Sequence, residues 1–600
     1  MIVPMIKYDL LLFHQDTAPF LERLQSLGVM DVQRSNRPVD THSASLLEEI
    51  NRYNAAYKLL GKLKTDDTEA DDTQHDSPAH ILKRTEELWE EHTQLNDRQA
   101  KLALEVQVSH PWGDWGTKPI DQLKKLDIVP HFYITAEKNY TTKAEQWQQE
   151  YIIKEINREN GKVYFAVLEI PNEPYSFPLT ETRLPTASVA VLENELDNIE
   201  LRQHTLLRKL ANYALQRERL ADYRNELMEK LDLYLAKQGA QSEVADSVAV
   251  LTAFVPEPQN AQVMEFLEQE QVVYLQVAAA MEDNPPVKLK NNKFAHLFEP
   301  IGEMFMPPLY NELDVTAYFS PFYMLFFGFC LGDMGYGLVL LLGATLAKFK
   351  LPKMRSLLTL VQFLGIGTII MPLISGTFFG MKLYDIFDID IKYKKMFFDD
   401  LQMFWFAIVF GGVQIIVAKI IHTIDSMLRN GWQHGLAHLG WTLLLIDAAL
   451  FAAKSFLGLP LPMWVVYALL GIGLLCILFF SNLKKNVFAR LPMGFVSLYD
   501  ITGIFGDLLS YIRLFGLGTA GGILGFVVNT VGMMCFGIPY AGWLIGGLVL
   551  LVGHIAVLAL SALGAFVHPM RLTFVEFYKN VGFTGGGRYY KPLKKSLNTK

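Results

Sequence analysis

The sequence predicts an α-helical integral membrane domain of about eight transmembrane helices, preceded by a cytoplasmic α+β domain. Charge and hydropathy both divide the chain near its middle. Residues 1–300 carry 32 Lys and Arg against 48 Asp and Glu, whereas residues 301–600 carry 22 against 14. Apolar segments near the roughly 17 to 25 residues that span a bilayer as a helix begin at about Val315. We therefore expect a cytoplasmic strut domain at 1–310 and a transmembrane domain at 311–600.

The cytoplasmic half is predicted to hold two α/β lobes joined by an antiparallel coiled-coil rod. Residues 8–33 and 247–277 each follow the pattern strand, helix, strand. Leu-rich helical stretches with many opposite charges lie at 43–108 and 187–237, as expected of coiled-coil flanks. The acidic segment 65–77 interrupts the first stretch as a solvated tip. Further strand-like runs lie between the helices, at residues 131–137 and 162–170.

Several kinds of site are not expected in this chain. The Gly-Lys pair at Gly161 lacks the upstream glycine and the following Ser or Thr of a phosphate-binding loop, so we expect neither ATP binding by that route nor catalysis. The start of the chain lacks the basic, apolar and small-residue regions of a signal peptide. Cys330, Cys476 and Cys535 fall in apolar segments without a disulfide or zinc spacing. No cofactor or metal is expected.

The positions of basic loops determine the expected number of spans. If residues 317–347 formed one span, the basic loop 348–355 would lie outside, against the preference of basic loops for the cytoplasm. We therefore expect a helical hairpin with "GDMGYG" at its tip, although each arm is short for a span. The eight expected spans are residues 317–332, 334–347, 356–379, 401–424, 433–454, 462–481, 493–535 and 540–570.

This count gives each loop a side of the membrane. The loops 348–355 and 482–490 and the tail 588–600 become cytoplasmic, and 384–400, 457–462 and 536–542 face the other side. The seventh span, 493–535, is too long to stand upright, because its residues would reach about 65 Å at 1.5 Å per residue. It must tilt strongly, break, or begin as an interfacial helix.

Arg513 is the residue in the membrane half that most needs an explanation. It lies near the middle of the long seventh span, where a lone arginine costs roughly 3 kcal/mol or more to insert. One interpretation is a functional site that presents the guanidinium to a partner. The other is a structural ion pair with Asp507, or an arginine whose side chain reaches an interface. Small residues beside it would let another helix approach closely, namely Gly516, Gly518, Ala520, Gly521, Gly522 and Gly525.

Other polar residues in the membrane half give weaker signals. Arg571 follows the last apolar run, where a cytoplasmic boundary arginine is also expected. His434 and His438 have the spacing of a metal pair on a helix but no acidic third ligand nearby, so we expect an ordinary interface. Asp333 is expected at the hairpin tip. Gln414 and Asp447 either line a polar cavity or satisfy neighbouring helices. Residues before Arg513 could hydrate a path towards it, namely Asp500, Asp507, Ser510 and Tyr511.

Three long stretches, 285–337, 499–522 and 568–592, resemble a known family. The second reads "YDITGIFGDLLSYIRLFGLGTAGG" and the third "HPMRLTFVEFYKNVGFTGGGRYYKP". They closely resemble the membrane stator subunit of rotary V-type and A-type ATPases, called subunit a in eukaryotes and subunit I in bacteria and archaea. The resemblance covers the whole chain, including the N-terminal half.

The resemblance implies a function in ion translocation. In this family two long, tilted C-terminal helices lie against a rotating ring of proteolipid subunits, each with a buried carboxylate. Arginines at the positions of Arg513 and Arg571 face that ring. A fixed cation would stabilise the ionised carboxylate, so that ions leave into one half-channel and reload from the other. The candidate half-channel residues are Asp500, Asp507, Ser510, Tyr511, Glu576, Gln414 and His568.

The resemblance also implies partners and a location. The partners are the proteolipid ring (c or K subunits), peripheral-stalk subunits of the E/G type, central-stalk subunits of the d/C type and membrane lipid, with no nucleic acid. The short chain and compact loops favour a prokaryotic enzyme in the cell membrane. Gly521 and Ser561 stand where eukaryotic members align a histidine and a glutamate. Neither the choice between H⁺ and Na⁺ nor that between ATP synthesis and pumping follows from this chain.

Two other functions agree less well with the sequence. A self-contained secondary transporter or channel with a cytoplasmic regulatory domain would show corresponding halves with discontinuous helices, and the sequence shows no such repeat. A membrane scaffold without transport would leave Arg513 unexplained. We therefore expect a non-catalytic stator subunit of a rotary ion-translocating ATPase.

Overall fold

The structure, a computed structural model, describes most of the chain. The described residues are 1–34, 40–63, 76–113, 122–123, 125, 127–170, 175–185, 187–243, 248–386, 397–457, 460, 462–481 and 487–595. Most of the predicted acidic tip at 65–77 lies outside these ranges, as do large parts of the loops predicted at 384–400 and 482–490. The chain divides into two compact units. One unit comprises residues Met1–Leu11, Val29–Val32 and Leu251–Pro592, and the other comprises Leu12–Gly28, Gln33–Val250 and Leu593–Lys600.

One sheet combines strands from both ends of the N-terminal half. Its order is β2, β7, β1, β8, with β6 paired to β7. β1 pairs antiparallel with β8, so that Leu10 lies opposite Tyr274, and β2 pairs antiparallel with β7. The predicted strand-helix-strand pattern is confirmed twice, with α1 after β1 and α8 before β8. The elements are β1 (Met5–Phe13), α1 (Thr17–Leu27), β2 (Asp31–Val32), β6 (Gln241–Glu243), β7 (Val248–Pro256), α8 (Asn260–Gln269) and β8 (Val273–Ala278).

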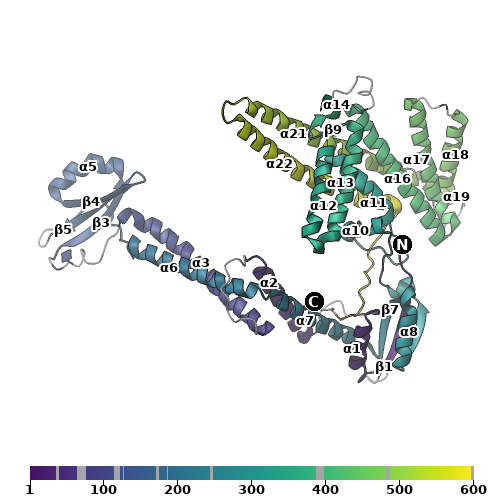
Figure 1. Cartoon of the computed structure of the whole chain (residues 1–600), viewed down its shortest axis with the longest axis horizontal. Helices are drawn as coiled ribbons and strands as arrows, with labels where there is room; N and C mark the ends of the chain where they lie inside the picture. The colour runs from purple at the N-terminus through teal and green to yellow at the C-terminus, as the bar shows by residue number, and fades with distance from the viewer. Residues whose placement is uncertain are drawn as a thin grey trace. The chain divides into compact units, whose positions relative to one another are not determined.

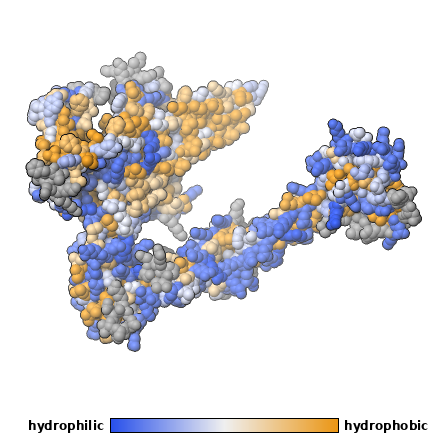
Figure 2. Space-filling model, turned by 180° about the vertical axis from the view of Figure 1, so that it is seen from behind, coloured by the Kyte–Doolittle hydropathy of each residue, from blue (hydrophilic) through white to orange (hydrophobic). Residues whose placement is uncertain are grey.

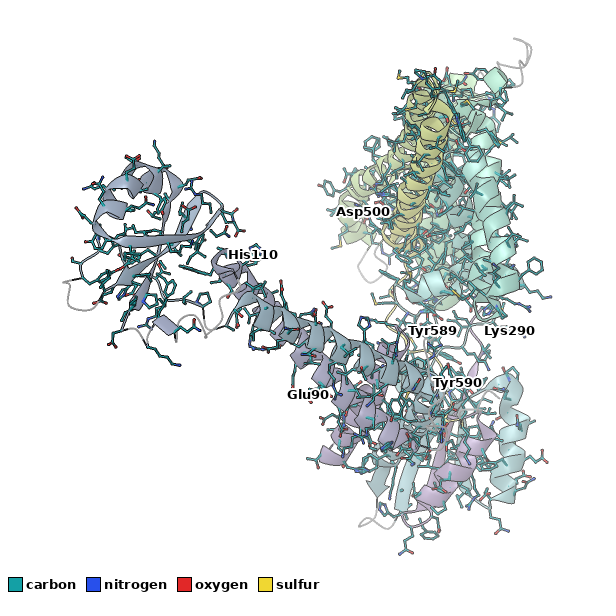
Figure 3. The ribbon with its side chains drawn as sticks, turned by 60° about the vertical axis from the view of Figure 1, so that its left-hand side comes forward. Glu90, His110, Lys290, Asp500, Tyr589 and Tyr590 are labelled. Carbon is teal, nitrogen blue, oxygen red and sulfur yellow. The ribbon has the colours of Figure 1, made fainter. Side chains whose placement is uncertain are left out.

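The rod consists of paired long helices, as predicted. α3 packs along α6, and α2 packs along α7. Arg98 pairs with Glu195 at 2.9 Å and Arg202 with Glu91 at 2.7 Å, and this order of pairs makes α3 and α6 antiparallel. Figure 3 labels Glu90 in α3 and His110 directly after its last residue. The helices are α2 (Thr41–Leu60), α3 (Pro78–Ser109), α6 (Val189–Ala214) and α7 (Arg217–Gly239).

A second lobe lies at the end of α3 and α6, as Figure 1 shows. It has a three-stranded sheet in the order β3, β5, β4 and one helix, α5. The strand β4 was not predicted. Asn160 and Gly161 both have positive φ and form the two-residue turn between β4 and β5, which is a turn typical of β-hairpins. An aromatic core of Tyr133, Trp147 and Phe165 fills the lobe. The elements are β3 (Val129–Ala136), α5 (Glu137–Glu150), β4 (Ile152–Glu159) and β5 (Lys162–Glu169).

Helices occupy all eight positions where spans were predicted. Six helical stretches among the described residues are long and apolar enough to cross a membrane, and α11 is apolar but shorter. The exposed surface of α21 and α22 is apolar, as Figure 2 shows. The helices are α11 (Thr316–Leu331), α12 (Met334–Lys350), α13 (Arg355–Ser375), α16 (Asp400–Asn430), α17 (Trp432–Leu457), α18 (Met463–Phe480), α19 (Val487–Ser497), α20 (Asp500–Leu509), α21 (Ile512–Phe536) and α22 (Gly542–Arg571).

The predicted hairpin is formed by α11 and α12, with only Gly332 and Asp333 between them. Gly332 has φ +67°, a conformation that glycine adopts without strain. Asp333 is fully buried at the tip and accepts hydrogen bonds from the backbone N–H groups of Gly335 and Tyr336, which caps α12.

The long seventh span breaks, which is one of the three outcomes that its length predicted. It consists of α19, α20 and α21, and the second break falls at Ser510 and Tyr511, directly before Arg513. There the Tyr511 N–H bonds back to Leu508 O at 3.2 Å, a three-residue spacing that is tighter than that of an α-helix. Arg513 therefore lies in the first turn of α21 rather than within a continuous helix.

The C-terminal segment contacts earlier residues of the same unit, near Val287 and at Asp31. The Tyr590 N–H donates to Val287 O at 3.0 Å, and the Arg588 carbonyl accepts from the Val287 N–H at 2.7 Å. Figure 3 shows Tyr589 and Tyr590 close to Lys290. The Arg588 guanidinium also pairs with Asp31 at 3.3 Å. These contacts connect the end of the membrane half to the sheet.

Candidate functional site

Arg513 is half-buried and lacks the ion pair that would have explained it structurally. Its Nη1 atom has no hydrogen-bond partner in the described part of the chain. Asp507 instead accepts hydrogen bonds from Lys579 Nζ at 3.0 and 3.1 Å and from Asn580 Nδ2 at 2.9 Å. The structural interpretation of Arg513 as the partner of Asp507 is therefore wrong.

Arg571, at the end of α22, lies within electrostatic range of the same residues as Arg513. It is the last residue of α22 and is exposed. His568 interacts electrostatically with both arginines, and so does Glu576. Residues from the start of α21, the end of α22 and the segment after α22 thus form one electrostatic cluster of four predicted residues: Arg513, Arg571, His568 and Glu576.

Glu576 is buried next to the two arginines. It lies in the π-helix η6 (Leu572–Phe577) that follows α22, and its side chain also interacts with Ser510 at the break before α21. Single π-turns occur frequently at functional sites. Its Oε2 atom has no hydrogen-bond partner among the residues described. The cluster therefore holds one carboxylate and two guanidinium groups.

Tyr511 and Gln414 attach the start of α21 to α16. The Tyr511 hydroxyl donates to Gln414 Oε1 at 2.7 Å, and both residues are fully buried. Gly411 makes room for this contact, since a Cβ at Gly411 would lie 2.1 Å from Tyr511 Cγ. The backbone on which Arg513 stands is therefore held by a polar contact two residues away.

Asp500 lines a cavity of about 590 Å³ at the N-terminal end of α20. Lys419, His422, His438 and Lys579 line the same cavity, and Figure 3 labels Asp500. His422 stacks on His438 with ring centroids 3.8 Å apart. His434 also lines this cavity, so the two histidines expected at an ordinary interface border a polar space. No group of three His, Cys, Asp or Glu within the described ranges could hold a metal ion.

A second cavity, of about 640 Å³, lies further along α21. Thr519 and Gly522 of α21 line it, together with Lys382 and with Asp400, the first residue of α16. Lys382 lies just before the loop 384–400, predicted to face away from the cytoplasm, and Asp400 is the last residue of that loop. The first cavity is lined by residues 500–504, before Arg513, and the second by residues 515–526, after it.

The small residues after Arg513 lie on two faces of α21. A Cβ at Gly518 would lie 2.5 Å from Phe329 O, and one at Gly525 would lie 3.0 Å from Gly380 Cα, so these glycines pack against the same chain. Gly516 has no neighbour within 4 Å of such a Cβ, and Ala520 is exposed. The expected close approach of another helix is therefore found at Gly518, where that helix is α11 of the same chain, and Gly516 and Ala520 lie on the face that is not packed in this way.

Several residues of this region were not predicted as members of the site. Lys579 and Asn580 bind Asp507, and Lys419 and His422 line the cavity beside Asp500. Lys419 could have been identified from the sequence, because it is a charged residue within a long apolar helix, α16. By contrast, Asp447 of α17 is buried with Oδ1 unpaired in the described part of the chain, and it lines neither cavity.

Comparison with known proteins finds relatives that share one name. No protein-family model matches the chain. The chain is 30% identical to A-type ATP synthase subunit I of Pyrococcus horikoshii over 72% of its own length and 65% of that protein. It is 25% identical to V-type ATP synthase subunit I of Borreliella burgdorferi over 99% of its length and 100% of that protein. Along nearly its whole length the chain is similar to subunit I of A-type and V-type ATP synthases.

Within the subunit I family, coverage differs between relatives. The chain spans 65% of the Pyrococcus relative and 64% of A-type ATP synthase subunit I of Methanocaldococcus jannaschii, to which it is 26% identical. A solved structure described as the cytoplasmic N-terminal domain of subunit I, homolog of subunit a, of V-ATPase matches 46% of the chain at 14% identity, with a TM-score of only 0.20. The described part of the chain combines helices that are long and apolar enough to cross a membrane with an N-terminal α+β domain.

Proposed function

We propose that this subunit carries the ion path of a rotary ATPase membrane sector. Arg513 supplies the fixed positive charge opposite the carboxylates of a rotating proteolipid ring. The observation that carries the proposal is the half-buried Arg513 guanidinium, free of any ion pair in the described ranges, with one cavity bordered by residues before it and another by residues after it.

The chemistry follows from electrostatics in a medium of low dielectric constant. A guanidinium stays charged at any accessible pH, whereas a desolvated lysine can lose its proton. A carboxylate that passes Arg513 is held in its ionised form, because the nearby positive charge favours the charged state. It must therefore release its ion before it reaches Arg513 and bind another afterwards. Arg571, on the neighbouring helix, extends this positive field.

The two cavities would supply the two half-channels. The cavity at Asp500 is lined by residues next to the predicted cytoplasmic loop 482–490, and the cavity at Thr519 by residues next to the loop 384–400, predicted to face the other side. Ions would enter from one and leave by the other. The region between the two cavities would be shaped or held by the other candidate residues, namely Ser510, Tyr511, Gln414, Asp507, Glu576 and His568.

The N-terminal half would act as a strut in this proposal. Its paired helices suit a rod that resists torque, and it would contact peripheral-stalk subunits of the E/G type and central-stalk subunits of the d/C type. The subunit would be non-catalytic and would lie in the cell membrane of a prokaryote. Either H⁺ or Na⁺ fits the site, since the selective carboxylate belongs to the ring.

The test replaces Arg513 in the whole complex reconstituted into vesicles. ATP hydrolysis and ATP-driven ion uptake are measured separately, with dyes for H⁺ and for Na⁺. Arg513→Ala should abolish uptake in assembled complexes, and Arg513→Lys should retain little. Thr530→Val, which removes only a hydroxyl bonded to Phe526 O in its own helix, is the matched control. Full uptake by assembled Arg513→Ala complexes would refute the proposal.

A further inference from the structure

A chain of hydrogen bonds joins α21 and α22 to the α11–α12 hairpin at the end of the helix pair remote from Arg513. The Asn529 side chain donates through Nδ2 to Phe379 O at 2.5 Å. Asn529 Oδ1 lies 3.0 Å from His554 Nε2, and His554 Nδ1 lies 2.8 Å from the Tyr336 hydroxyl. We call these four residues the bracket. They come from α21, α22, α12 and the turn between β9 (Thr377–Phe378) and β10 (Met381–Lys382).

The direction of every hydrogen bond in the bracket follows from its ends. A carbonyl oxygen only accepts, so Asn529 must present Nδ2 to Phe379 and Oδ1 to His554. Oδ1 also only accepts, so His554 Nε2 carries the proton. With a neutral imidazole, Nδ1 then accepts from the Tyr336 hydroxyl. Each hydrogen-bonding atom named in the bracket therefore has a complementary partner, as polar groups away from water require.

The turn that receives this chain is itself held by a buried carboxylate. Phe379 has φ +48° and Gly380 has φ +74°, and a bulky residue rarely adopts the first value. Asp333 accepts from the Phe379 N–H at 2.8 Å and from the Gly380 N–H at 2.6 Å. The turn is pressed against α21, since a Cβ at Gly380 would lie 2.3 Å from Gly525 C. Asp333 therefore fixes a strained turn in the one conformation that reaches Asn529.

The bracket lies on the same two helices as the arginines, so a shift between the helices at the bracket would also displace the arginines relative to each other. Asn529 lies 16 residues after Arg513 on α21, and His554 lies 17 residues before Arg571 on α22. At 1.5 Å per residue both separations are about 24 to 26 Å. The two helices pack along the intervening length, where a Cβ at Gly521 would lie 3.4 Å from Ser561 Oγ and one at Gly564 would lie 3.6 Å from Leu517 Cδ2. A shift of one helix by one residue at the bracket would move Arg571 past Arg513 by about 1.5 Å.

We propose that Asn529 and His554 are positioning residues that hold α21 and α22 in register, through the chain Tyr336, His554, Asn529 and Phe379, so that Arg513 and Arg571 stay together at the other end. The proposal rests on the proposed function, because register matters only if the arginines must meet a passing carboxylate. Neither residue lines either cavity, so their effect is on alignment and not on access.

The test measures ions taken up per ATP hydrolysed in assembled complexes in vesicles. Asn529→Leu and His554→Leu should lower this ratio roughly tenfold or more, since ångström displacements of positioned groups have effects of that size. His554→Gln, whose amide offers one donor and one acceptor, should restore most of it. Tyr336→Phe removes one hydroxyl and should have a smaller effect of the same kind. Thr530→Val, next to Asn529, is the control.

The outcomes separate this proposal from the one on which it rests. If Arg513→Ala pumped normally, the proposed function would fail. If Arg513→Ala lost uptake while the leucine variants kept the wild-type ratio, the bracket proposal alone would fail. Equal loss in His554→Gln and His554→Leu would also overturn it, because it would indicate ring packing instead of directed hydrogen bonds. Should the leucine variants fail to assemble, the comparison of Tyr336→Phe and His554→Gln with wild type decides.

Discussion

Asp507 and Lys579 form an ion pair at 3.0 Å that joins α20 to α23 (Tyr578–Val581). Asp507 lies six residues before Arg513. The carboxylate is buried, whereas the Lys579 side chain is 57% exposed. Asn580, which is buried, donates a third hydrogen bond to Asp507. The acidic residue nearest in sequence to Arg513 is therefore neutralised by another cation.

We expect Asp507→Ala to destabilise the protein more than Lys579→Met does. Removing the carboxylate leaves the buried Asn580 amide without that acceptor, which costs about 1 to 3 kcal/mol. An exposed lysine contributes about 1 kcal/mol or less to an ion pair. Denaturant unfolding of the purified subunit measures both free energies. A larger loss of unfolding free energy for Lys579→Met would contradict this prediction. It would mean that solvent does not screen the ion pair, despite the exposure of Lys579.

The contact between Tyr511 and Gln414 predicts a characteristic double-mutant result. Tyr511→Phe leaves the buried Gln414 without this hydrogen bond, so we expect a loss of about 1 to 3 kcal/mol in unfolding free energy. Adding Gln414→Leu should recover part of the loss, because no polar group is then left buried and unpaired. Losses that simply add in the double variant would show that the two side chains act independently.

Two adjacent glycines of α16 provide a matched pair of substitutions. Gly411→Ala places a Cβ 2.1 Å from Tyr511 Cγ and should destabilise by about 1 to 3 kcal/mol, as overpacking does. It should also reduce ion uptake, since Tyr511 carries the start of α21. Gly412→Ala places its Cβ 3.6 Å from Leu508 Cδ1, an ordinary contact, and should be neutral or gain up to about 1 kcal/mol from helix propensity. Vesicle uptake assays and unfolding of both variants check this, and equal behaviour would contradict it.

The distal lobe should lose stability as the pH rises. His131 lies between Glu169 at 2.8 Å and Glu181 at 2.9 Å and stacks on Tyr175. Burial by itself lowers the pKa of His131, but the hydrogen bonds to the two carboxylates outweigh it and raise the pKa above its ordinary value of 6.5. A raised pKa in the folded state means that the stabilisation is fully present below about 6.5 and is lost as the pH passes through the folded value.

Hydrogen exchange of residues 175–182 in the full chain, corrected for the intrinsic pH dependence of exchange, measures this effect. Protection should fall with rising pH in the wild type and be flat in His131→Gln. His110, which contacts the single carboxylate of Glu159 and is more exposed, is the matched position, and His110→Gln should retain the wild-type pH dependence. A pH dependence that survives His131→Gln would assign the effect to another group.

Much of the fold could be predicted because its signals are local. Apolar runs of span length and the heptad-like stretches predicted the membrane helices and the rod. A break was among the outcomes that the length of the seventh span predicted. Strand β4 was missed because its alternating residues are charged and half-exposed, although Asn160 and Gly161 marked its turn.

Pairings between distant residues could not be predicted in the same way. Asp507 is six residues from Arg513, and sequence proximity favoured that pair, yet its carboxylate binds Lys579 and Asn580. The glycines after Arg513 give no sign in the sequence that Gly518 and Gly525 face their own chain while Gly516 does not. The four members of the bracket come from three helices and one turn, and no spacing in the sequence connects them.

By itself the sequence determined where the membrane helices and the rod lie and that a charged residue, Arg513, stands in an apolar span. Hydropathy and helical period depend on neighbouring residues, so they can be read along the chain. Only the tertiary structure decided that α21 starts after a break, that Arg571, His568 and Glu576 join Arg513, and that Asp507 belongs to Lys579. Such contacts form when packing brings together residues far apart in the sequence, and their energies depend on distance and burial, which the order of residues does not contain.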